Sequence, residues 1–130
     1  MFDVVEDFGG RIVLDATETG ERGMCARFDR RRLQLDPLIE LSEAYFGSIP
    51  DASRRPNSQL YNWLKYELTG RGVRGIIFRR YIWCDIWHAE LYRLKQWSGL
   101  PVLDMDVSGD QKTLSLQTTQ RIGAFLEMLR

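Results

Sequence analysis

The sequence has few of the residues that build covalent or metal-rich scaffolds. Its 130 residues include two cysteines, Cys25 and Cys84, and a single histidine, His88. Two cysteines are too few for a disulfide framework, and we expect both thiols to be reduced. No apolar run approaches the ~20 residues that span a bilayer, and the acidic start Met1–Asp7 lacks a signal-peptide pattern. These absences predict a cytoplasmic protein without a membrane anchor.

The chain also lacks net charge, because 18 Lys and Arg residues balance 18 Asp and Glu residues. No overall field therefore recruits nucleic acid or an anionic membrane. Arginines do cluster at 30–32, 54–55 and 79–80. A solvated surface or ion pairing is the favoured interpretation of these clusters, with contact to an anion as the alternative.

Apolar residues recur with the periods of helices and of buried strands. Asp36-Pro37 has the form of a helix start, with an N-cap followed by proline, and Gly99 is a helix stop. Leu38, Leu41, Tyr45 and Phe46 then recur at helical spacing. The expected strands are 11–16, 75–81 and 101–106, and the expected helices are 1–8, 37–46, 58–70, 85–98 and 113–129 or 116–129. The stretches 17–32 and 47–56 are expected to be loops.

The alternation of strands and helices predicts the fold class. Such an order gives a parallel sheet with right-handed crossovers, and mostly apolar strands are typical of a sheet covered on both faces. We expect one α/β domain over 1–130, with a three-layer, open parallel sheet of the Rossmann or flavodoxin type and helices on both faces. Three strands are few for this architecture, so we expect the sheet to lack one strand.

Cys84 is the strongest candidate for a chemical role. In Gly75–His88 a buried strand stops and becomes a helix, with Cys84 at the turn. Open α/β sheets place their chemistry at the carboxyl ends of strands, and amides at a helix start favour the thiolate that attacks substrates or binds metals. The position alone does not separate a nucleophile from a metal ligand, and a small buried hydrophobe is the common role of free cysteine.

Four other polar residues are weaker candidates. His88 follows Cys84 by four residues and could share its helix face as a nucleophilic or metal-binding pair. Cys25 follows the expected first strand, and a bystander role is favoured for it. Asp104 and Asp106 should share one face of the last strand, where solvated acids are the favoured interpretation.

Several segments together resemble one enzyme family. These are Phe8–Val13, the Asp36-Pro37 helix start, Gly75–Phe78, Trp83-Cys84-Asp85, Leu100–Leu103 and Gln120–Leu129. They are similar to the C-terminal domain of the subunits of 2-hydroxyacyl-CoA dehydratase and benzoyl-CoA reductase, and the likeness covers essentially the whole chain. The stretch Trp83–His88 leans toward the benzoyl-CoA reductase branch.

The resemblance implies anaerobic radical chemistry on an acyl-CoA. In the family, an ATP-dependent iron–sulfur activator supplies one electron to a 4Fe-4S cluster, which passes it to the thioester. Cys84 is the position that matches a cluster ligand. The family's other cluster cysteines lie in an N-terminal domain outside these residues. We therefore expect no cluster on the isolated chain, no activity from it alone, and a homologous subunit or N-terminal half as its partner.

Two further interpretations stay open. An incomplete sheet leaves an unpaired strand edge that invites a partner, which favours a non-catalytic interaction or assembly domain. A flavodoxin-like binder of a small ligand, using the strand ends without metal, is the weaker alternative.

Overall fold

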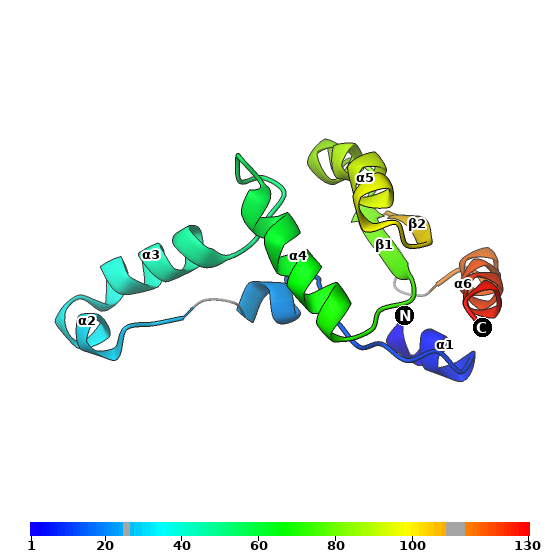
Figure 1. Cartoon of the computed structure of the whole chain (residues 1–130), viewed down its shortest axis with the longest axis horizontal. Helices are drawn as coiled ribbons and strands as arrows, with labels where there is room; N and C mark the ends of the chain where they lie inside the picture. The colour runs from blue at the N-terminus through cyan, green and yellow to red at the C-terminus, as the bar shows by residue number, and fades with distance from the viewer. Residues whose placement is uncertain (25–26, 109–113) are drawn as a thin grey trace. The chain divides into compact units, whose positions relative to one another are not determined.

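A computed structural model describes residues 1–24, 27–108 and 114–130 of the chain (Figure 1). The described residues form two compact units, one of residues 1–13 with 71–130 and one of residues 14–70. The helices are α1 (Phe2–Asp7), α2 (Arg30–Leu35), α3 (Pro37–Ser48), α4 (Ser58–Gly70), α5 (Asp85–Ser98) and α6 (Leu116–Met128), with a 3₁₀ turn at Glu21–Met24. The strands are β1 (Ile76–Tyr81) and β2 (Val102–Val107). No helix in these ranges has the length and apolar character needed to cross a membrane.

A parallel two-stranded sheet organises the first unit. β1 pairs with β2 from Ile76 opposite Val102 to Tyr81 opposite Val107, and α5 connects the two strands. Gly99 ends α5 in the left-handed conformation, with φ of 63°, which glycine adopts without steric cost. The predicted parallel β–α–β order from residue 76 to residue 107 is confirmed.

Both faces of this sheet contact helices of the same unit. Successive strand residues point to opposite faces, so Ile77 and Phe78 of β1 face different ways. On one face Met105 of β2 packs with Val5 of α1 and Ile122 of α6, and Ile77 lies against this cluster. On the other face Phe78 contacts Trp87 of α5, with ring centroids 5.9 Å apart. The core of the unit therefore lies between the sheet and the pair α1 and α6.

The predicted strand at 11–16 is wrong. Its described hydrogen bonds are not those of a strand ladder. The Val13 carbonyl accepts from Arg71 Nη1 at 2.7 Å. The Asp15 amide donates to the Glu21 side chain, and the Glu21 amide donates to the Asp15 carbonyl, which closes a tight turn. Ile12 instead packs beside the core cluster as part of an extended connection. The sheet of the described residues therefore has two strands in place of three, and the expected Rossmann-type sheet is supported only as a mixed α/β arrangement.

The second unit is helical, and one of its helices was not expected. α2 begins in the last three residues of the predicted loop 17–32, and Asp29 caps it by accepting from the amides of Arg31 and Arg32. α3 begins as predicted, because Asp36 Oδ1 accepts from the Ile39 amide at 3.1 Å and proline follows the cap. The predicted loop 17–32 therefore ends three residues early, where α2 begins, and α3 follows as expected.

A buried arginine connects the loops of this second unit. Arg22 donates from Nε to the Ala16 carbonyl at 3.1 Å and from Nη1 to the Pro50 carbonyl at 3.3 Å. Arg22 also forms an ion pair with Asp51. Burial raises the pKa of Asp51, but hydrogen bonds from Ser53 and Arg22 outweigh it and hold the pKa below its usual 3.8.

Removing the Ile122 side chain tests the core. Ile122→Ala is expected to lower the free energy of unfolding by about 2–5 kcal/mol, because it opens a cavity among fully buried neighbours. Leu116→Ala on the same helix removes an exposed side chain and should change it by less than about 0.5 kcal/mol. Urea unfolding followed by circular dichroism measures both, and equal effects would contradict this core.

The Asp51 carboxylate predicts a stability change in acid. Since its folded pKa is depressed, its contribution is present above about pH 4 and is lost as the pH falls through the folded value. Asp51→Asn should therefore lose less stability than the wild type on acidification below pH 3.8. Urea midpoints measured across this range for both proteins give the comparison, and parallel profiles would refute the assignment.

Candidate functional site at the carboxyl end of strand β1

The backbone places Cys84 where the first strand becomes a helix. β1 ends at Tyr81, whose carbonyl accepts from the Cys84 amide at 2.9 Å and closes a turn. Cys84 is the N-cap of α5, and its carbonyl accepts from the His88 amide at 2.9 Å as the first helical bond. The thiol makes no capping bond, is not in a disulfide and is half-buried. The predicted strand–turn–helix geometry around Cys84 is therefore confirmed, while its chemical role stays a prediction.

Exposed apolar residues lie directly before and shortly after this cysteine in the sequence. We define the rim as the exposed side chains of Tyr81, Ile82, Trp83 and Ile86. Trp83, directly before the cysteine, is 89% exposed. Large apolar side chains grouped at a surface usually mark a contact with another molecule. The thiol thus lies at an edge whose neighbours favour apolar contact.

The described residues form no metal-binding group around Cys84. His88 is exposed on the first turn of α5. Within the described ranges, no three His, Cys, Asp or Glu side chains are grouped closely enough to hold a metal ion. Cys25 lies outside the described residues. The described part of the chain therefore places a single thiol at the strand end, without a group of three side chains that could hold a metal ion.

Asp104 and Asp106 are not isolated solvated acids, because both face Arg80. Arg80 Nη1 lies 2.7 Å from Asp106 Oδ1, and Nη2 lies 3.3 Å from Asp104 Oδ2. The arginine side chain is only 5% exposed. We call these three residues the arginine bridge. It connects neighbouring strands on one sheet face, since Phe78 pairs with Asp104 and Arg80 with Asp106 in the ladder.

Hydrogen bonding of the arginine bridge is incomplete. Arg80 Nε and Asp104 Oδ1 are buried without a hydrogen-bond partner among the described residues. The Asp104 backbone carbonyl accepts from Arg121 of α6 at 2.6 Å. Sequence reasoning noted the cluster 79–80 but missed that Arg80 pairs with the two acids of the bridge. The available signal was the strand period, which places Arg79 and Arg80 on opposite faces. The arginine cluster at 79–80 is thus ion pairing in part, as the favoured interpretation held.

The arginine bridge should stabilise the sheet strongly. Arg80→Ala leaves Asp104 and Asp106 without their cation, and we expect a loss of about 3 kcal/mol in the free energy of unfolding. Arg79→Ala removes the exposed neighbour and should cost less than about 0.5 kcal/mol. Chemical denaturation of the two variants measures this contrast, and similar midpoints would show that the bridge contributes little.

The comparisons with known proteins agree with the sequence resemblance. No curated protein matches the chain. The family described as 2-hydroxyglutaryl-CoA dehydratase, D-component, matches residues 1–129 of the 130. The family resemblance noted in the sequence is confirmed by this match. The chain therefore belongs to the 2-hydroxyglutaryl-CoA dehydratase D-component family.

Proposed function

We propose that residues 1–130 form one domain of an iron–sulfur enzyme that acts on a CoA thioester, of the 2-hydroxyacyl-CoA dehydratase or benzoyl-CoA reductase type. The observation that carries the proposal is the family match over residues 1–129, combined with a free thiol at the carboxyl end of β1. The family name favours dehydration of a 2-hydroxyacyl-CoA over reduction of an aromatic ring.

A 4Fe-4S cluster does not fit the described residues of this chain alone. Such a cluster is held by four cysteine thiolates, and the described residues provide one, Cys84. We propose that Cys84 contributes one ligand and that a homologous subunit or an N-terminal half contributes the others. An ATP-dependent iron–sulfur activator is the proposed electron donor of the assembled enzyme.

The rim around Cys84 supports a site completed by another surface. Trp83 is almost fully exposed, and Tyr81, Ile82 and Ile86 extend its apolar character beside the thiol. Docking of a companion surface on these side chains would exclude water from the thiol. The turn that holds the Cys84 backbone to Tyr81 fixes the position of the thiol before docking.

A non-catalytic assembly domain is the second candidate. Within the described residues, β1 and β2 pair only with each other, so each has an outer edge available for further strand pairing. This interpretation predicts complex formation without any dependence on iron. Measuring complex formation with and without iron therefore distinguishes the assembly function from the iron–sulfur function.

Replacement of Cys84 tests the proposed ligand. The chain is co-expressed anaerobically with its companion subunit and the activator, and iron, acid-labile sulfide and dehydratase activity of the complex are measured. Cys84→Ser should lose most of the iron and the activity, because a serine hydroxyl is a poor cluster ligand. Cys25→Ser is the matched control and should retain both.

Each result of this experiment has a distinct meaning. Unchanged iron and activity in Cys84→Ser would reject the ligand assignment. A stable complex that contains no iron in the wild type would reject the iron–sulfur function and favour the assembly domain. Loss of complex formation in Cys84→Ser would assign Cys84 to the interface rather than to a cluster.

A further inference from the structure

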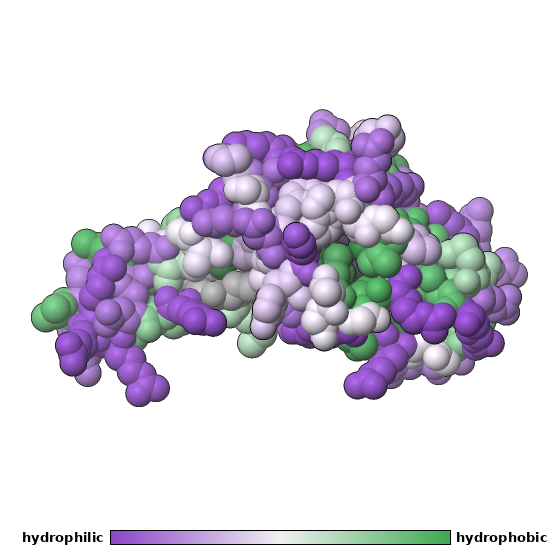
Figure 2. All heavy atoms as spheres, in the orientation of Figure 1, coloured by the Kyte–Doolittle hydropathy of each residue, from purple (hydrophilic) through white to green (hydrophobic). Residues whose placement is uncertain are grey.

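Helix α3 carries its polar and apolar residues on the reverse of the usual sides. Its buried residues are Glu40 and Ala44. Leu38 is 78% exposed and Phe46 is 84% exposed, and Ile39 between them is also exposed. Hydrophobic atoms reach the surface around α2 and α3, at the left of Figure 2, among hydrophilic ones. A helix with apolar residues on its outer side is usually covered by another molecule.

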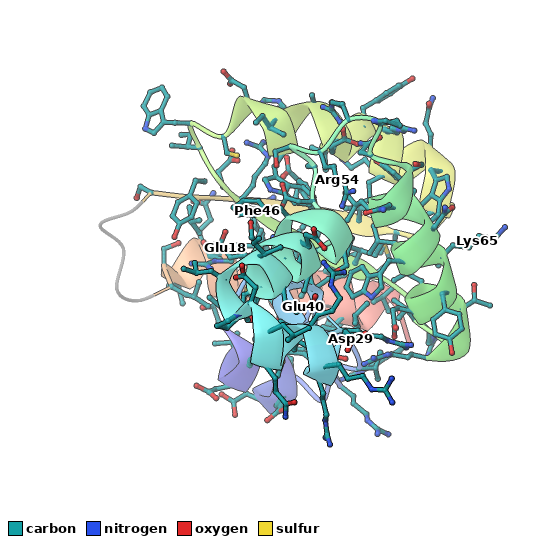
Figure 3. The ribbon with its side chains drawn as sticks, turned by 90° about the vertical axis from the view of Figure 1, so that its left-hand side faces the viewer. Glu18, Asp29, Glu40, Phe46, Arg54 and Lys65 are labelled. Carbon is teal, nitrogen blue, oxygen red and sulfur yellow. The ribbon has the colours of Figure 1, made fainter. Side chains whose placement is uncertain are left out.

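Specific bonds hold Glu40 on the inner side of α3. Its Oε1 accepts from the amide of Asp29 at 2.7 Å, and Figure 3 labels both residues. Its Oε2 lies 3.2 Å from Arg32 Nε. Arg32 also pairs with Glu43, and Glu43 followed by Glu40 raises the pKa of the Arg32 guanidinium. Rotation of α3 to bury its apolar side would break these bonds. The exposure of Leu38 and Phe46 is therefore built into the α2–α3 packing.

The outward residues are spaced symmetrically about Ser42. We define the outward stripe as Leu38, Ile39, Ser42, Tyr45 and Phe46, all of which are exposed. Residues 38 and 46 lie four positions from Ser42, and residues 39 and 45 lie three positions from it. An antiparallel pair of identical helices crossing at Ser42 would place Leu38 against Phe46 and Ile39 against Tyr45. This is the reciprocal contact that a two-fold axis requires.

We propose that the outward stripe of α3 binds the same stripe of a second copy of this chain. Ser42 lies at the two-fold axis, where its small side chain allows close approach of the helices. An open hollow lined by Leu38, Ile39, Ser42 and Glu43 receives Phe46 of the copy. This inference uses no part of the iron–sulfur proposal and stands or fails independently of it.

Charge at the edge of the stripe suits a second copy. Glu43 is paired with Arg32 of its own chain, so two copies meet without a row of uncompensated like charges. Antiparallel packing also places the positive end of each α3 macrodipole beside the negative end of the other. The electrostatics therefore agree with self-association, whereas an acidic or basic partner would have no matching charge to contact along the stripe.

The apolar area of the outward stripe suits a weak dimer that forms at high concentration. Burying a large aliphatic or aromatic side chain removes roughly 100 Å² from water. Four large side chains of the outward stripe are exposed on each copy: Leu38, Ile39, Tyr45 and Phe46. Two copies would bury about 800 Å² of side-chain area in total, which is the size of a weak, transient interface.

Sedimentation of the whole chain tests the proposal directly. The chain has a mass of 15.2 kDa, and sedimentation equilibrium should give twice this mass at high concentration. Phe46→Glu should raise the dimer dissociation constant at least about tenfold, because it places a charge in the apolar contact. Tyr66→Glu on α4 changes another exposed aromatic residue and should leave the constant unchanged.

A disulfide at the proposed axis gives an independent test. In a chain with Cys25→Ser and Cys84→Ser, oxidised Ser42→Cys should form a covalent dimer rapidly, and Lys65→Cys on α4 should not. Both positions are exposed, so the folded structure should tolerate both changes. A monomer at all concentrations, equal cross-linking of the two variants, or association only with a companion subunit would overturn the proposal.

Discussion

The register between β1 and β2 is the constraint on which the candidate site depends. Arg80 is buried and bears a charge, which is costly unless acids lie opposite it. Asp104 and Asp106 lie on its face only in the observed register, in which Arg80 pairs with Asp106. A shift of one residue would turn both aspartates toward the side occupied by Val5 and Ile122. The arginine bridge therefore selects the register as well as stabilising the pair.

The same register determines where Cys84 lies. Parallel strands require a crossover, and α5 supplies it, so the carboxyl ends of β1 and β2 lie at one edge. The Ile82 amide donates to the Val107 carbonyl at 3.2 Å, which continues the pairing up to the turn before the cysteine. Because the turn and the first bond of α5 both use the Cys84 backbone, the thiol is held at this edge while its side chain stays available.

Much of the fold was predictable because its signals are local. The cap Asp36, the stop Gly99 and the apolar start of β1 at 76–78 act on residues close in sequence, and each gave the correct element. The segment 11–16 has the composition of a strand, but a strand also needs a neighbouring ladder, which sequence period does not reveal. Arg80 was missed for the same reason, since its acids lie 24 and 26 residues away along the chain.

The period of α3 illustrates the limit of such reasoning most directly. Leu38, Leu41, Tyr45 and Phe46 recur as the sequence predicted, but a period identifies an apolar side without saying what covers it. In α3, Glu40 determines which side of the helix faces inward. Its hydrogen bond from Asp29 and its ion pair with Arg32 hold the carboxylate inside, so Leu38 and Phe46 point outward. A buried acid with fixed partners can thus turn the apolar side of a helix outward, where it becomes a surface for association.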